Sequence, residues 1–258
     1  MRVAITGADG FLGSHLARRF LKGGWQVTGL VRDLPGKRLP DGAVRYFNYS
    51  FPADLDPAAL DEPPDALIHC AFVRDAATTS GDTRNIEAAE FLLRLCRKPG
   101  GPGFVFISSM SAHEQAESRY GREKLAIEKL LRAGPGLSIR PGFILGPGGV
   151  FLQLAKSLQR LPAIPLFYGG RQPIHTVHVD DVCAAVETAI AKRLGGLLKV
   201  GEPEAVAVDE FYRAVVESLG LRKLSVRLPG RFALAFLRTT ERLGLRWPIS
   251  SENLLGLK

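Results

Sequence analysis

Residues 6–13 read Thr6-Gly7-Ala8-Asp9-Gly10-Phe11-Leu12-Gly13, and this stretch decides the fold. It follows an apolar run, residues 2–5, that is typical of a buried parallel strand, and it leads into residues 11–21, which have helical periodicity. Gly7 permits a tight turn, Gly10 lets the backbone approach a pyrophosphate, and Gly13 lets the helix pack closely on the strand. We therefore predict a dinucleotide site at Gly7, Gly10, Phe11, Leu12 and Gly13. An ordinary glycine turn is the alternative.

Strands and helices alternate along most of the remaining chain. Apolar runs predict strands, and helical periodicity predicts helices; the strands are 25–32, 44–49, 66–71, 104–107 and 137–140, and the helices are 85–97, 119–132 and 180–192. This alternation predicts an α/β protein with a doubly wound parallel sheet, the Rossmann fold. Past residue 142, glycines and prolines break the pattern. We expect a dinucleotide-binding domain over 1–145. Over 146–258 we expect a mixed region, in which a small C-terminal substrate-binding lobe interleaves with the last sheet elements.

Composition excludes several classes of protein. The 258 residues are 46% hydrophobic and 23% charged, which is typical of a globular protein. No apolar run approaches the roughly 20 residues that span a bilayer, and the chain opens on a strand, so we expect a cytoplasmic protein without stable membrane insertion. The three cysteines are widely separated and predict neither a disulfide framework nor a metal site. The net charge is +8, but the 34 basic residues are scattered along the chain, which favours an anionic cofactor or substrate over nucleic acid.

Tyr120 and Lys124 lie four residues apart in a predicted helix, so they share one face of it. A phenol with an ordinary pKa of about 10 is a weak base at neutral pH, whereas a neighbouring ammonium favours the phenolate. Such a pair can exchange a proton with an alcohol or a carbonyl. Ser109, just beyond the strand 104–107, can hydrogen-bond the same substrate oxygen, and Ser111 is a weaker alternative. A chance pairing on a surface helix is the competing interpretation.

Taken together, these motifs resemble the short-chain dehydrogenase/reductase superfamily, and in particular its extended or atypical branch of NAD(P)-dependent epimerases, dehydratases and reductases. The resemblance runs from Met1 to about Val182. Besides the glycine loop and Tyr120-Gly121-Arg122-Glu123-Lys124, it rests on further short segments, which are His69-Cys70-Ala71, Asn85, Phe106-Ile107-Ser108-Ser109, Arg140-Pro141-Gly142 and His178-Val179-Asp180-Asp181-Val182.

The resemblance implies a catalytic triad of Ser109, Tyr120 and Lys124. Tyr120 would act as acid or base, Lys124 would favour its phenolate and bind the nicotinamide ribose, and Ser109 would orient the reacting oxygen. It also implies cofactor contacts at Cys70, Ala71 and Pro141, with hydride transfer between the nicotinamide and a small-molecule carbonyl, alcohol or sugar substrate. A homodimer is plausible on the same ground.

Two departures from the family pattern bear on the substrate. Ser109 and Tyr120 are only eleven positions apart, and the chain is short for a sugar-nucleotide epimerase of this branch. Both features argue against a standard nucleotide sugar. Reductase and epimerase or dehydratase chemistry therefore stay open as alternatives, together with a non-catalytic NAD(P)-binding sensor or assembly subunit.

The choice of cofactor depends on the end of the second predicted strand. An acidic residue there grips the ribose hydroxyls of NAD, whereas an arginine accommodates the phosphate of NADP. Arg32 stands first and Asp33 second. Because a guanidinium binds phosphate in a forked geometry, Arg32 favours NADP over NAD. In the alternative, Arg32 is solvated and Asp33 pairs with the ribose of NAD.

The C-terminal apolar segment, Phe232-Ala233-Leu234-Ala235-Phe236-Leu237, has arginines at both ends. A buried helix is the ordinary interpretation, and contact with a membrane or an apolar substrate is the alternative.

Overall fold

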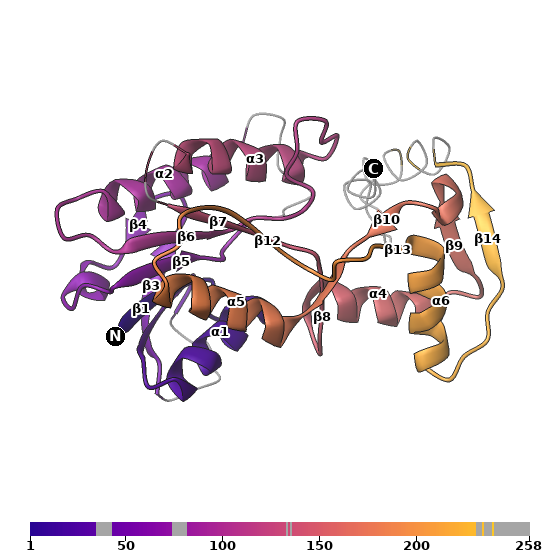
Figure 1. Cartoon of the computed structure of the whole chain (residues 1–258), viewed down its shortest axis with the longest axis horizontal. Helices are drawn as coiled ribbons and strands as arrows, with labels where there is room; N and C mark the ends of the chain where they lie inside the picture. The colour runs from indigo at the N-terminus through magenta and orange to yellow at the C-terminus, as the bar shows by residue number, and fades with distance from the viewer. Residues whose placement is uncertain are drawn as a thin grey trace.

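A computed structural model describes residues 1–34, 43–73, 82–132, 134, 136–230, 234 and 239. Within these residues, one eight-stranded sheet organises the larger part of the molecule (Figure 1). Its strand order is β12-β7-β6-β5-β1-β2-β3-β4, and every neighbouring pair is parallel except β3 and β4. The strands are β1 (Arg2–Thr6), β2 (Gln26–Val31), β3 (Arg45–Ser50), β4 (Asp54–Leu55), β5 (Ala66–His69), β6 (Gly103–Ile107), β7 (Leu137–Pro141) and β12 (Gly196–Val200).

Two helical layers cover the sheet, one on each face (Figure 1). In β6, Val105 and Ile107 pack with the layer of α1 (Phe11–Lys22) and α5 (Val179–Ala191). Phe104 and Phe106 pack with the opposite layer, α2 (Arg84–Cys96) and α3 (Arg119–Leu131). Successive residues of a strand point to opposite faces, so continuous apolar strands are what a sheet covered on both sides requires.

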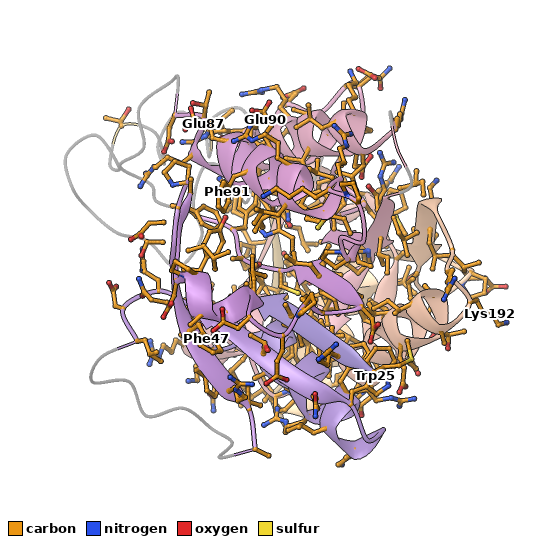
Figure 2. The ribbon with its side chains drawn as sticks, turned by 90° about the vertical axis from the view of Figure 1, so that its left-hand side faces the viewer. Trp25, Phe47, Glu87, Glu90, Phe91 and Lys192 are labelled. Carbon is orange, nitrogen blue, oxygen red and sulfur yellow. The ribbon has the colours of Figure 1, made fainter. Side chains whose placement is uncertain are left out.

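The helix periodicity agrees with this arrangement. Figure 2 shows Glu87 and Glu90 on the outer side of α2 and Phe91 on the side toward the sheet. Phe91 stacks on Tyr49 of β3 with ring centroids 6.4 Å apart. The polar and apolar faces of α2 therefore match solvent and sheet as expected for an amphipathic helix.

A smaller lobe lies beyond one end of the sheet (Figure 1). Its apolar cluster includes Leu158, Ile164, Leu166 and Phe211. The lobe comprises α4 (Gly149–Arg160), β9 (Ile164–Phe167), the 3-10 helix η2 (Tyr168–Gly170), β10 (Pro173–Ile174), β13 (Val206–Ala207), α6 (Val208–Ser218) and β14 (Ser225–Leu228). The pair β8 (Phe143–Leu145) and β11 (Thr176–His178) lies between the lobe and the sheet. A second 3-10 helix, η1 (Pro57–Leu60), follows β4.

The predicted α/β architecture with a doubly wound sheet and a small C-terminal lobe is confirmed. The chain leaves the sheet after β7, builds part of the lobe, and returns as α5 and β12. The exact boundary at 145/146 stays a prediction. The C-terminal apolar segment falls outside the described residues except for Leu234. Within the described part of the chain, no helix is both long and apolar enough to cross a membrane.

Candidate active site

The glycine loop joins the end of β1 to the start of α1. Gly7 has a φ of 65° and donates its N–H to the Leu30 carbonyl at 2.8 Å, while the Gly10 N–H donates to the Gly7 carbonyl at 2.9 Å. A Cβ on Gly13 would collide with the Gly7 carbonyl oxygen and lie 2.8 Å from its carbon. Gly13 is therefore required for the close packing of helix on loop that the sequence predicts.

The same loop leaves the N-terminus of α1 open toward an anion. Gly10 is its N-cap and provides no side-chain hydrogen bond, and the first turn contains no acidic residue. The first backbone N–H groups of a helix lack intrahelical partners, and the helix dipole adds partial positive charge there. This cradle fits the pyrophosphate of a dinucleotide, with Phe11 and Leu12 supplying the first N–H groups.

Thr6 ties the ends of β1 and β5 together beside this cradle. Its Oγ1 accepts the N–H groups of Cys70 and Ala71, each at 3.1 Å. The same hydroxyl is hydrogen-bonded to Nδ1 of His69 at 2.9 Å. Burial lowers the pKa of His69 to about 3, so this imidazole is neutral at physiological pH. Thr6 thus fixes the backbone of the two predicted cofactor contacts, Cys70 and Ala71.

Cys70 lines this edge as a free, half-buried thiol. Burial raises the pKa of its thiol to about 12, so the side chain stays protonated at neutral pH. The role expected of Cys70 is therefore steric rather than nucleophilic. A Cβ on Gly7 would lie 3.1 Å from the Cα of Ala71, which places the glycine loop directly against this strand end.

The loop after β6 carries Ser109, and the first turn of α3 packs on this loop. Ser109 Oγ accepts the N–H of Ser111 at 3.2 Å, which orders the hydroxyl at the start of the loop. A Cβ on Gly121 would collide with the Ser111 carbonyl oxygen. Ser118 begins the helix by accepting the Gly121 N–H at 3.1 Å. Because Gly121 follows Tyr120 directly, this contact brings the predicted tyrosine to the serine loop.

Lys124 is buried on the inner face of α3, one turn after Tyr120. Its Nζ donates to the Ile107 carbonyl at 2.6 Å, two residues before Ser109. The same ammonium lies 5.6 Å from the centre of the Tyr120 ring and 4.4 Å from that of Phe72. Phe72 in turn meets Tyr120 edge to face, with centroids 5.1 Å apart. The predicted tyrosine and lysine therefore share one aromatic enclosure at the carboxyl ends of β5 and β6.

A buried ion pair braces the serine loop from behind. Glu128, on the same face of α3 as Lys124, accepts two bonds from Arg140, at 2.7 Å from Nε and 2.5 Å from a terminal nitrogen. The same carboxylate accepts the Ser108 hydroxyl at 2.5 Å. This forked pair joins α3 to β6 and β7, so it holds the strand ends on which Ser109 is mounted.

A second buried network holds the segment after β5. Asn85, at the start of α2, accepts the Val73 N–H at 2.9 Å and donates to the Val73 carbonyl at 3.1 Å. It also donates to Glu123 at 2.8 Å, and Glu123 pairs with Arg119 one turn earlier in α3. Asn85 therefore fixes the chain next to Phe72, and this explains why an asparagine opens the helix.

Arg32 and Asp33 follow β2 at the same carboxyl edge of the sheet. Their side chains pair with each other at 3.3 Å and are 68% and 78% exposed. Asp33 has a φ of 54°. Either side chain is therefore accessible to a cofactor, Arg32 to the phosphate of NADP or Asp33 to the ribose of NAD. Pro141 is buried at the end of β7, where its carbonyl accepts the Met110 N–H at 3.4 Å.

The structure thus brings most of the predicted site residues to one edge of the sheet. The glycine loop, Cys70, Ala71, Ser109 and Pro141 follow strands β1, β5, β6 and β7 there, and α3 adds Tyr120 and Lys124. Thr6, Glu128 and Phe72 also contribute to this edge, and none of them was predicted from the sequence as a site residue. A hydroxyl at a strand end and an acidic residue on the inward face of α3 are the signals that point to the first two.

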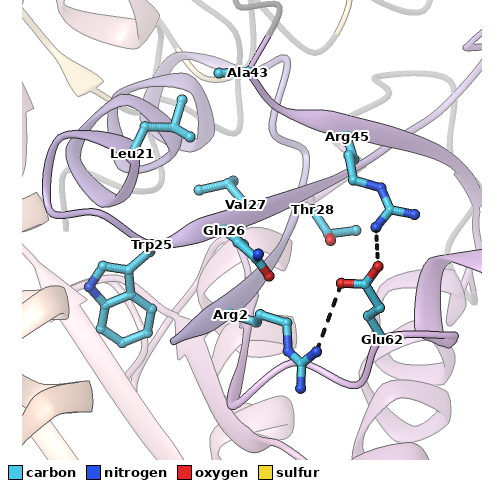
Figure 3. Close-up of a pocket in the computed structure, with 9 residues that line it drawn as sticks. All are labelled: Arg2, Leu21, Trp25, Gln26, Val27, Thr28, Ala43, Arg45 and Glu62. Atoms are coloured by element: carbon cyan, nitrogen blue, oxygen red, sulfur yellow. Dashed lines mark hydrogen bonds and ion pairs between the residues drawn. The ribbon is translucent and has the colours of Figure 1, made fainter.

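A cavity of about 270 Å³ lies elsewhere, at the amino ends of β1, β2 and β3 (Figure 3). Its charged lining is already paired, since Glu62 binds Arg45 at 2.7 Å and Arg2 at 3.8 Å. Because parallel strands place their carboxyl ends at the opposite edge, this cavity is separate from the glycine loop.

The family model described as the NAD dependent epimerase/dehydratase family matches residues 3–201. The chain belongs to this family. The resemblance to the extended short-chain dehydrogenase/reductase branch is therefore confirmed, and the names of family and relatives indicate an NAD-dependent reductase, epimerase or dehydratase.

The proteins to which the chain is similar include a reductase and an epimerase by name. The chain is 30% identical over 236 residues to the ceramide reductase of Caulobacter vibrioides, covering 88% of this chain and 73% of that protein. It is 25% identical to the mouse short-chain dehydrogenase/reductase family 42E member 1, over 91% of this chain and 72% of the relative. The crystal structure of the Thermus thermophilus UDP-glucose 4-epimerase with NAD aligns with a TM-score of 0.71 and 23% identity, over 99% and 98% of the two chains. The last similarity concerns the fold.

Proposed function

We propose that the protein is an NAD(P)-dependent oxidoreductase that reduces a carbonyl, or oxidises the corresponding alcohol, with Ser109, Tyr120 and Lys124 as catalytic residues. The observation that carries the proposal is the packing of α3. Gly121 places the helix against the Ser111 carbonyl, and Lys124 donates to the Ile107 carbonyl, so Tyr120 is held beside the Ser109 loop. The glycine loop lies at the same edge of the sheet.

Each of the three residues has a distinct task. When held at the glycine loop, a nicotinamide coenzyme would supply the hydride that the carbonyl carbon accepts. Tyr120 donates its phenolic proton to the carbonyl oxygen as the alcohol forms, and Ser109 donates a hydrogen bond that holds that oxygen in place. The ammonium of Lys124, 5.6 Å from the Tyr120 ring, stabilises the phenolate that remains. The phenolate regains its proton from water, and in the oxidative direction the steps reverse.

We propose an apolar, long-chain carbonyl compound as the substrate class. The ceramide reductase relative supports this choice, and so does the surface of the lobe. Large hydrophobic side chains are exposed on several lobe segments, namely Val150, Leu152, Val206, Leu219, Leu224, Val226 and Leu228. A nucleotide-sugar epimerase or dehydratase is the second candidate, because the family is described as epimerase/dehydratase and the fold is shared with the Thermus thermophilus UDP-glucose 4-epimerase.

We propose NADP as the preferred coenzyme, with the Arg32 guanidinium on the additional phosphate. Arg32 follows β2, where the adenosine ribose is expected. Its ion pair with Asp33 is exposed to solvent, so the guanidinium can exchange that carboxylate for a phosphate. A cytoplasmic location and a homodimer stay predictions.

The test compares wild type with Tyr120→Phe on a long-chain aliphatic ketone in detergent micelles and on UDP-galactose. The proposal predicts that wild type oxidises NADPH in a ketone-dependent reaction. The rate of this reaction should fall by at least about 100-fold in Tyr120→Phe, since general acid catalysis contributes that much. Coenzyme affinity should be unchanged. Tyr49→Phe is the matched control, because that hydroxyl binds the Pro52 carbonyl far along the sheet.

The remaining outcomes separate the alternatives. Epimerisation of UDP-galactose without net coenzyme turnover would support the second candidate. Coenzyme binding with equal behaviour of wild type and Tyr120→Phe in every assay would contradict the catalytic role of Tyr120 and favour a non-catalytic sensor or assembly subunit.

A further inference from the structure

The ring of Phe11 sits among three glycines that lie more than 130 positions later in the chain. A Cβ on Gly148 would collide with Phe11 Cδ2. A Cβ on Gly149 would lie 2.7 Å from Phe11 Cδ1, and one on Gly146 would lie 2.8 Å from Phe11 Cζ. Each distance is shorter than ordinary contact, so side chains at these three positions are incompatible with the ring where it stands.

Phe11 and Gly148 both lie at the start of a helix. Phe11 is the first residue of α1, directly after its N-cap Gly10. Gly148 is the N-cap of α4, whose far end contributes Leu158 to the apolar cluster of the lobe. The ring therefore connects the glycine loop of the sheet to the helix that leads into the lobe.

Both partners of this contact are anchored. The Gly148 N–H donates to the Gly146 carbonyl at 2.8 Å, and the preceding strand β8 pairs with β11. On the other side, His15 meets the Phe11 ring edge to face at 4.8 Å between centroids. A change at position 148 therefore has to be absorbed at Phe11, and through it by the backbone of the glycine loop.

We propose that Phe11 is a positioning residue, seated in the glycine turn 146–149, that sets the glycine loop in register with the lobe. The proposal rests on the proposed function, because its consequence is that a lobe glycine controls the affinity for the coenzyme. Phe11 acts here through its ring, in addition to any contact of its N–H with a phosphate.

Gly148→Ala is the informative change. Gly148 has a φ of −171°, an extended conformation that any residue adopts, so the substitution introduces no backbone strain. The three atoms nearest to an added Cβ all belong to the Phe11 ring. In a Phe11→Ala background that ring is gone, and the added methyl group should be tolerated. Gly201→Ala is the matched control, because its nearest neighbour is the His175 Cβ at 3.5 Å, an ordinary contact.

The experiment measures the dissociation constants of NADH and NADPH by fluorescence, and the urea midpoint without ligand, for wild type, both single variants, the double variant and Gly201→Ala. Overpacking of this kind should weaken coenzyme binding at least about 10-fold in Gly148→Ala and lower its urea midpoint. Added to Phe11→Ala, the same substitution should change neither quantity further, and Gly201→Ala should match wild type.

Three results would overturn the proposal: equal effects of Gly148→Ala in both backgrounds, no effect in the wild-type background, or a lowered urea midpoint with unchanged coenzyme affinity. Folded wild type that binds neither coenzyme would instead contradict the proposed function. In that case the urea midpoints still decide whether the Phe11 ring and the glycine turn are coupled. If the shifts of the midpoint in the two single variants add up to the shift in the double variant, the positioning role of Phe11 is contradicted as well.

Discussion

The sheet side and the lobe differ in which side chains they bury and which they expose. All nine buried polar or charged residues of the described ranges lie on the sheet side, and they are Thr6, His69, Asn85, Ser108, Ser118, Glu123, Lys124, Glu128 and Ser138. The described lobe contributes none to that set, yet it exposes seven of the ten large hydrophobic residues that are open to solvent. Buried polar groups need fixed partners, so the sheet side is built to hold atoms at set positions, whereas the described lobe turns apolar side chains to solvent.

The strongest test of this difference removes the carboxylate of Glu128. Glu128→Ala leaves the Arg140 guanidinium, whose side chain is only 12% exposed, without its partner. Breaking a buried pair in this way should lower the free energy of unfolding by about 3–5 kcal/mol. Urea denaturation measures it. Asp209→Asn is the control in the lobe, where the exposed pair with Arg213 should contribute less than about 1 kcal/mol. Similar losses for both variants would remove the contrast.

A cavity in the lobe should separate stability from coenzyme binding. Leu158 is 2% exposed in the apolar cluster of α4, β9 and α6. Leu158→Ala should lower the free energy of unfolding by about 2–3 kcal/mol through lost burial and the cavity left behind. The affinity for NADH should stay at the wild-type value, since Leu158 lies at the far end of α4 from the glycine loop. A large loss of NADH affinity in a folded variant would mean that the two regions are not distinct.

The neutral histidine under the site predicts a pH dependence. The pKa of His69 falls from an ordinary 6.5 to about 3 on burial, so the unfolded chain binds more protons between these values. Stability should therefore be complete above pH 6.5 and decrease as the pH falls toward 3. His69→Phe, which keeps an aromatic ring among Phe51, Phe104 and Phe106, should show a flatter slope of unfolding free energy against pH than wild type. Parallel slopes would contradict the assignment.

The smallest expected effect concerns coenzyme choice at the exposed end of β2. Arg32→Ala should weaken NADPH binding about 10-fold and leave NADH binding unchanged, because the guanidinium acts on the additional phosphate. Fluorescence titration with both coenzymes measures it, and Arg45→Ala, at the amino end of β3, controls for the loss of one positive charge. An equal loss for NADH, or preferential NADH binding by wild type, would favour the Asp33 alternative.

The sequence predicted the sheet and the helix faces because apolar runs and helical periodicity reflect burial directly. The expected strand 104–107 and helix 119–132 agree with β6 and α3 to within one residue at each end. Local spacing also led to Tyr120 and Lys124. What it could not indicate was the set of partners from distant segments. Glu128 in α3 pairs with Arg140 in the next strand, β7, and Phe11 meets a turn that follows β8, so only the folded chain reveals these contacts.

The central claim is that the carboxyl edge of the sheet binds a dinucleotide through the glycine loop, and coenzyme titration tests it most directly. NADH and NADPH are titrated into wild type, Gly13→Ala and Gly103→Ala, with circular dichroism to verify folding. A Cβ at Gly13 collides with the Gly7 carbonyl, whereas the nearest atom at Gly103 is 3.7 Å away. The account predicts binding by wild type and Gly103→Ala, and a loss of at least about 100-fold, or about 2.8 kcal/mol, in Gly13→Ala. Folded wild type that binds neither coenzyme, or undiminished binding by Gly13→Ala, would contradict it.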